Sequence, residues 1–218
     1  MDSIDKLTEI FKEFPGIGER QARRFVYFLM FKNGEYSNNL SKLILELKKE
    51  VSQCKECFKF FLTSKTKNNS TPKDGQVCEI CSNPNTDSSL LLVVEKDSDL
   101  ESINKSGVYH GKYFILGGLV PIVEKTTKSR VRIEELKKII SARGDLKEII
   151  LAFSISPQGD HTDQYVREQL RDIVEKQNPS TPLRAGIKIS SLGKGLSTGT
   201  ELEYSDNDTL KNALKNRQ

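Results

Sequence analysis

The sequence predicts an α/β protein of several parts, with helices first, a metal-binding segment next and a parallel sheet last. Three observations support this order. Apolar residues recur every three to four positions between residues 3 and 52, which is typical of amphipathic helices. All four cysteines fall between residues 54 and 81. After them, short apolar runs alternate with stretches of helical periodicity, which indicates a parallel sheet covered on both faces.

The composition is that of a globular protein with one large or two small domains. The chain has 218 residues, of which 36% are hydrophobic and 29% are charged. No apolar run approaches the roughly 20 residues that span a bilayer, and the first residues lack the features of a secretory signal. We therefore expect a cytoplasmic protein without a membrane partner. A net charge of +4 is too small to indicate nucleic-acid binding by itself.

The first 52 residues predict three helices. The first is expected to be capped by Asp2 or Ser3 and to stop at Pro15, since proline cannot continue a helix. The second is expected to end near Gly34, and the third to begin at Ser37. The first carries an apolar stripe, and apolar residues recur along the other two, among them Leu40, Leu43, Ile44 and Leu47 in the third.

The turn between the first two helices has the pattern of a helix-hairpin-helix element. Gly16 and Gly18 let the backbone approach another backbone closely, and the free amides that open the second helix form an anion site. Arg20, Arg23 and Arg24 follow within reach of neighbouring phosphates and would read no base sequence. The pattern predicts DNA binding, and a plain helix corner with solvated arginines is the alternative.

The cysteines form two pairs, Cys54-x-x-Cys57 and Cys78-x-x-Cys81, separated by twenty residues. Two such turns supply the four sulfurs of a closed tetrahedral zinc site, in which the metal fixes a fold and has no open position for catalysis. Two disulfides, or one redox pair with two spare thiols, are the alternatives. A cytoplasmic location favours zinc, as does the polar stretch 63–75, which could bury little by itself.

The remaining chain predicts strands that alternate with helices. We expect strands at 90–94, 113–116, 148–152 and 185–189, and helices at 98–105, 133–142 and 162–176. A flexible loop at 193–199 and a short helix at 206–216 complete the chain.

Ligands of such sheets gather at the carboxyl ends of the strands, where this chain offers few carboxylates. Only Glu95 and Asp160 are suitably placed, and Ser154, Ser156 and Gln158 fill the positions between. Magnesium-assisted phosphoryl transfer needs several converging carboxylates, so the sequence gives little support for catalysis.

Taken together, these features resemble the RecR family of bacterial recombination mediator proteins. The resemblance covers nearly the whole chain, and the run from Val93 to Glu95 opens what looks like a Toprim domain. Besides the two glycines of the hairpin turn and the cysteine pairs, it rests on the segments 77–84, 113–121, 148–152, 159–162 and 193–204.

The resemblance implies a non-enzymatic clamp for recombinational DNA repair. Proteins of this family resemble rings of four subunits that associate through their N-terminal and C-terminal regions around a basic hole. They bind single- and double-stranded DNA without sequence preference and act with RecO and RecF to load RecA on single-stranded DNA at gaps. The implied parts are a helix-hairpin-helix region (1–53), a four-cysteine zinc finger (54–84), a Toprim domain (85–184) and a C-terminal region for oligomerisation (185–218).

The resemblance also assigns site residues. Arg20 and Arg24 match family positions for DNA contact, whereas Arg23 rests on the local pattern alone. Glu95 and Asp160 are implied to bind a partner, RecO, on the acidic face of the Toprim domain. Gln158-Gly159-Asp160 stands where the family has Glu-Gly-Glu, so this face is altered here.

Two other functions compete with the clamp. One is a Toprim-type magnesium-dependent enzyme, a nuclease or primase, against which the Ser154-Ile155-Ser156 run in place of Asp-x-Asp argues. The other is a zinc-ribbon scaffold without a role on DNA.

Overall fold

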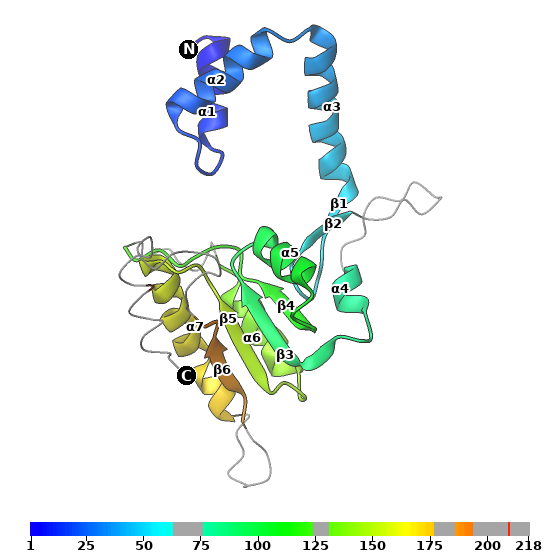
Figure 1. The fold of residues 1–218 in the computed structure, drawn as a ribbon, viewed down its shortest axis with the longest axis vertical. Coiled ribbons are helices and arrows are strands. Elements are labelled where there is room, and N and C mark those ends of the chain that lie inside the picture. The colour runs from blue at the N-terminus through cyan, green and yellow to red at the C-terminus, as the bar shows by residue number, and fades with distance from the viewer. Residues whose placement is uncertain (63–75, 124–130, 177–185, 194–208, 210–218) are drawn as a thin grey trace. The chain divides into compact units, whose positions relative to one another are not determined.

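The computed structural model describes residues 1–62, 76–123, 131–176, 186–193 and Thr209. These residues form two compact units, one of residues 1–51 with Leu62 and one of the remainder (Figure 1). The predicted loop at 193–199 and the predicted helix at 206–216 lie outside the described residues, apart from Gly193 and Thr209.

The first unit consists of the helices α1 (Ser3–Lys12), α2 (Glu19–Met30) and α3 (Gly34–Glu50). Asp2 caps α1 as predicted, because its side chain accepts a hydrogen bond from the backbone N–H of Asp5 at 2.8 Å. The ring centroids of Phe11 and Phe25 lie 5.7 Å apart and join α1 to α2. Two helices joined by a short glycine turn are consistent with the predicted helix-hairpin-helix.

The boundary between α2 and α3 differs from the prediction. We expected the third helix to begin at Ser37, but it begins at Gly34, because the side chain of Asn33 caps it by accepting the N–H of Tyr36 at 2.9 Å. No residue of α3, all of which are described, is fully buried. Leu43, Ile44 and Leu47 are each more than half exposed, so the predicted apolar stripe is present but has no cover within its own unit.

The segment around the cysteines contains little regular structure. The strands β1 (Val51–Gln53) and β2 (Phe60–Leu62) form a two-stranded sheet, and α4 (Glu79–Ser82) is a single turn that begins after Cys78. Such a segment has almost no core of its own, as the sequence predicted.

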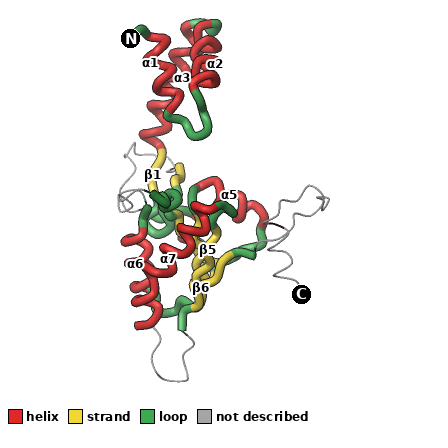
Figure 2. The backbone as a smooth tube through the Cα atoms, turned by 90° about the vertical axis from the view of Figure 1, so that its left-hand side faces the viewer, coloured by secondary structure: helices red, strands yellow, loops and turns green. Residues whose placement is uncertain are grey.

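The rest of the second unit is a four-stranded parallel sheet with helices, which confirms the predicted α/β class (Figure 2). The strands are β3 (Asp87–Val94), β4 (Gly111–Ile115), β5 (Glu148–Ala152) and β6 (Lys188–Ser191), in the order β4-β3-β5-β6. In the central register, Leu92 pairs with Tyr113 on β4 and with Ile150 on β5. The helices are α5 (Asp97–Ser106), α6 (Ile133–Ala142) and α7 (Pro157–Lys176).

Each face of this sheet packs into a separate cluster of side chains. Leu91, Phe114 and Leu151 face the side where α6 and α7 lie next to each other (Figures 1 and 2). On the opposite face, Leu92 and Tyr113 pack with Leu100 of α5 and with the four cysteines. The cysteine segment is therefore part of the core of the second unit.

Two predicted boundaries near the end of the sheet were wrong. The last strand is Lys188–Ser191, later than the predicted 185–189. Helix α7 begins at Pro157 and not near residue 162, because the hydroxyl of Ser156 accepts the N–H of Gly159 at 3.1 Å and caps the helix. Asp160, which precedes the predicted helix, therefore lies in the first turn of the observed one.

Candidate functional site

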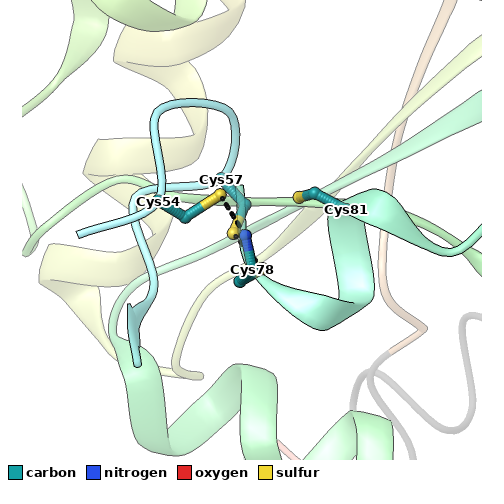
Figure 3. Close-up of side chains that lie close together, drawn as sticks. All are labelled: Cys54, Cys57, Cys78 and Cys81. Carbon is teal, nitrogen blue, oxygen red and sulfur yellow. Dashed lines mark hydrogen bonds between the residues drawn. The ribbon is translucent and has the colours of Figure 1, made fainter. Parts of the chain in front are cut away.

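The four cysteines come together as predicted and are all buried (Figure 3). Their sulfur atoms lie within 4.8 Å of one another, and the Sγ atoms of Cys57 and Cys78 are 3.6 Å apart. Four thiolates at about 2.3 Å from one zinc ion stand roughly 3.8 Å apart in a tetrahedron, so the donor set fits a single ion. Within the described residues, no other group of three or more side chains could hold a metal ion.

The turn that carries the first cysteine pair is held by its own backbone. The N–H of Phe58 donates to the carbonyl of Cys54 at 3.0 Å, and the N–H of Cys54 donates to the carbonyl of Lys59 at 2.9 Å. Closing this turn places Phe58 at φ 63°, in the left-handed region that non-glycine residues rarely adopt. The N–H of Cys78 points at the Cys54 sulfur at 3.4 Å, where it stabilises negative charge.

Hydrogen bonds join both cysteine turns to strand β4. The N–H of Ile115 donates to the carbonyl of Cys57 at 2.9 Å, and the ammonium of Lys112 donates to the carbonyl of Cys81 at 2.8 Å. Each cysteine pair is thereby anchored to the sheet by one backbone carbonyl.

Phe58 and Arg132 complete this attachment. The ring of Phe58 packs edge-on against Phe114 with centroids 5.4 Å apart. The guanidinium of Arg132 lies over the Phe58 ring, 5.4 Å from its centroid, and donates to the carbonyl of Ile115 at 3.1 Å. Neither residue was predicted from the sequence, and only the φ requirement after the second cysteine could have pointed to Phe58.

The thiols perturb one another strongly. Hydrogen bonding with Cys57 lowers the pKa of the Cys54 thiol far below its ordinary value. Hydrogen bonding with Cys54 and burial raise the pKa of the Cys81 thiol far above its own. The shifts run in opposite directions because the buried thiols donate hydrogen bonds to and accept them from one another. All four cysteines are free thiols in this structure.

The hairpin turn presents the open end of α2. Gly16 has φ +76°, which requires glycine, and Gly18 is the N-cap of α2. No side-chain hydrogen bond caps α2 in the described structure, whereas Asp2 and Asn33 cap α1 and α3. The first amides of α2 are therefore open to an anion.

The three arginines of α2 differ in their surroundings. Arg20 and Arg24 are exposed, and Arg24 touches only the side chain of Gln21, at 3.4 Å, among the side-chain hydrogen bonds of the described residues. Arg23 forms ion pairs with Asp5 at 3.8 Å and Glu19 at 3.5 Å. Arg23 is therefore the weaker candidate for a DNA contact.

The two carboxylates predicted to bind a partner occupy different places at the carboxyl ends of the strands. Glu95 is half-buried directly after β3, and its carbonyl accepts the N–H of Gly117 at 2.9 Å. Asp160 is exposed and lines a hollow of about 170 Å³ together with Phe153 and Leu192, which Glu95 does not line.

Serines occupy the two positions where a magnesium-dependent Toprim enzyme has the carboxylates of Asp-x-Asp. The hydroxyl groups of Ser154 and Ser156 lie 3.1 Å apart, and Ser156 caps α7. The described residues bring no third carboxylate to Glu95 and Asp160, so the donor set that a magnesium-dependent enzyme needs is not assembled here.

Sequence comparison identifies two regions of the chain. The Toprim domain family matches residues 89–178, and the family described as RecR, C-terminal, matches residues 195–218. Among the described residues, no helix is long and apolar enough to cross a membrane.

Relatives match the chain over almost its whole length. The recombination protein RecR of Lactobacillus acidophilus is 32% identical over 214 residues, which cover 98% of this chain and 96% of the relative. The RecR proteins of Dehalococcoides mccartyi (33% identical, 99% of this chain and 94% of the relative) and Legionella pneumophila (31%, 100% and 96%) are similar to the same extent. These names designate a recombination protein, as the resemblance implied. The chain belongs to the RecR family of recombination proteins.

Proposed function

We propose that the chain is a zinc-containing DNA clamp for recombinational repair, which works with RecO and RecF to load RecA on single-stranded DNA at gaps. The observation that carries the DNA-binding part is the open amino end of α2, with Arg20 and Arg24 exposed beside it. Partly positive backbone amides and two guanidinium groups on one helix end suit phosphate oxygens and read no bases.

Zinc is the ion that best suits the cysteine site. Four buried sulfurs within 4.8 Å of one another favour a soft divalent ion over magnesium or calcium, which prefer oxygen. When bound, the ion neutralises the thiolates and contributes folding free energy. Cys54, Cys57, Cys78 and Cys81 hold it, and Phe58 orients the first pair.

Association into a tetrameric ring is the second part of the proposal. The uncovered leucine and isoleucine side chains of α3 support a protein contact there, since solvated helices rarely expose a continuous apolar stripe. The residues 185–218 supply the other contact, and the ring acts in the cytoplasm. Glu95 and Asp160 bind RecO, and the division of the chain into four parts at residues 53, 84 and 184 follows the family.

Charge reversal at the helix end tests the DNA-binding part. Arg20→Glu combined with Arg24→Glu should abolish binding of a labelled oligonucleotide at low salt, while circular dichroism and zinc content stay unchanged. Lys138→Glu combined with Arg171→Glu changes the net charge equally on exposed positions of α6 and α7, and should retain most of the binding. Equal binding by the arginine variant and the unaltered protein would remove the basis of the proposal.

A further inference from the structure

We propose that one face of α2 is a binding stripe for single-stranded nucleic acid, in which Tyr27 and Phe31 stack on bases next to phosphate contacts from Arg20 and Arg24. This inference rests on the proposed DNA-binding function and adds to it the side chains that would prefer single strands over a duplex.

The four side chains line up because of helix geometry. At about 100° per residue, positions 20, 24, 27 and 31 fall within a sector of roughly 60° around the axis of α2. Phe31 follows the last helical residue but keeps helical backbone angles of φ −79° and ψ −13°. The buried residues Ala22 and Val26 lie on the opposite side of the helix. The stripe therefore faces away from the core of its unit.

Both rings are exposed, and Phe31 is almost fully so. Phe31 is 90% exposed and Tyr27 is 46% exposed. The aromatic side chains Phe25 and Phe28 of α2 each have an aromatic or cationic partner. The ring of Phe28 has the ammonium of Lys32 at 4.7 Å, and Phe25 packs on a ring of α1. Among the described residues, neither Tyr27 nor Phe31 has such an aromatic or cationic partner, so both rings can receive a base.

The charge of the stripe selects a polyanion as the occupant. Two arginines and no carboxylate lie in the sector, and Glu19, the one acidic residue in the sequence of α2, lies about 100° away and pairs with Arg23. Arginines followed by exposed rings are the combination that binds single strands, where phosphates and unpaired base faces occur together. A second copy of the chain that bound here through the same stripe would place arginines against arginines, because the stripe contains no carboxylate.

The dimensions of the stripe suit a short stretch of single strand. Phe31 lies eleven positions after Arg20, which corresponds to roughly 16 Å along the helix. A stacked strand advances about 3.4 Å per nucleotide, so the stripe covers on the order of five nucleotides. In a duplex the base faces are already stacked and paired, so the rings add little there. The stripe therefore favours single strands.

Ring removal on the full-length protein tests this. Tyr27→Leu and Phe31→Leu keep apolar helix-compatible side chains, and each should weaken binding of a labelled oligothymidine by about fivefold or more. Binding of a duplex of the same length should change by less than about twofold. Phe60→Leu removes a ring of similar exposure (52%) outside the stripe and should leave both affinities unchanged. Unchanged oligothymidine binding by both stripe variants would overturn the inference.

A fluorescence measurement separates stacking from other effects. The chain has no tryptophan, so Phe31→Trp introduces a single indole. Oligothymidine should quench its emission, and an abasic strand with the same phosphates should bind more weakly and quench less. Equal quenching by both strands would overturn the stacking role. If the leucine variants change only the mass of the assembly, the stripe is a protein contact, which also overturns it.

Failure of this inference differs from failure of the proposed function. If the unaltered protein binds neither strand, the DNA-binding proposal itself is refuted together with this inference. If it binds, and charge reversal of Arg20 and Arg24 abolishes binding while ring removal does not, only the stacking stripe is refuted.

Discussion

Replacing Thr162 by valine probes how the loop after β4 is fastened to α7. Thr162 and Val120 are both fully buried, at 0% and 1% exposure. The Thr162 hydroxyl accepts the N–H of Val120 at 2.9 Å and donates to the carbonyl of Gln158 at 2.7 Å. Valine has nearly the same shape but offers no acceptor, so the Val120 N–H would stay buried without a partner.

The cost follows from the orphaned donor. A buried N–H that loses its acceptor costs about 1–3 kcal/mol, whereas the carbonyl of Gln158 keeps its place in the helix. We expect Thr162→Val to lower the free energy of unfolding by about 2 kcal/mol and the Tm by roughly 4–8 °C for a chain of this length. The amide of Val120 should exchange with solvent faster by about tenfold or more.

Urea unfolding and amide hydrogen exchange measure both effects. Thr162→Ser keeps the hydroxyl and loses one methyl group, so it should preserve the slow exchange of Val120 and separate the hydrogen bond from packing. A valine variant within about 0.5 kcal/mol of the unaltered protein, with Val120 exchange unchanged, would refute the assignment of this hydrogen bond.

Three further perturbations have defined outcomes. Gly159→Ala should destabilise the start of α7 by about 1–3 kcal/mol in urea unfolding, because a Cβ there collides with the backbone carbonyl of Ser154. The Ser190 hydroxyl, which donates to Glu148 at 2.6 Å, and then Lys188 hold the pKa of Glu148 below its ordinary value, so its stabilisation is present above about pH 4.3 and is lost as pH falls. Unfolding midpoints between about pH 3 and 6 should therefore fall less steeply in Glu148→Gln. A chelator should release one zinc ion per chain, seen with a metallochromic dye, and lower the Tm; a chain that keeps its Tm without metal contradicts the structural role of zinc.

Continuous apolar runs and paired cysteines made much of the second unit predictable. The strand at 148–152 and the helix at 133–142 match the structure at both ends, since each begins and ends where the apolar pattern changes. The four cysteines could be assigned to one site because two Cys-x-x-Cys turns leave few other arrangements.

The boundaries that failed were set by caps. Asn33 and Ser156 each start a helix earlier than the apolar pattern suggests, and Ser156 followed by Pro157 is a start signal that the sequence does contain. The surroundings of Arg23 could not be read from sequence, because its partner Asp5 reaches it only after α1 packs on α2. The same holds for Arg132, which meets Phe58 through the tertiary fold.

The central claim is that the N-terminal end of α2 binds phosphates. The salt dependence of binding to a single-stranded oligonucleotide tests this claim most directly. If Arg20 and Arg24 each contact one phosphate, the plot of log affinity against log salt concentration should become shallower by about 1.4 in Arg20→Ala combined with Arg24→Ala. An unchanged slope in that variant would contradict the account, because the counterions released on binding would then be displaced by residues elsewhere in the chain.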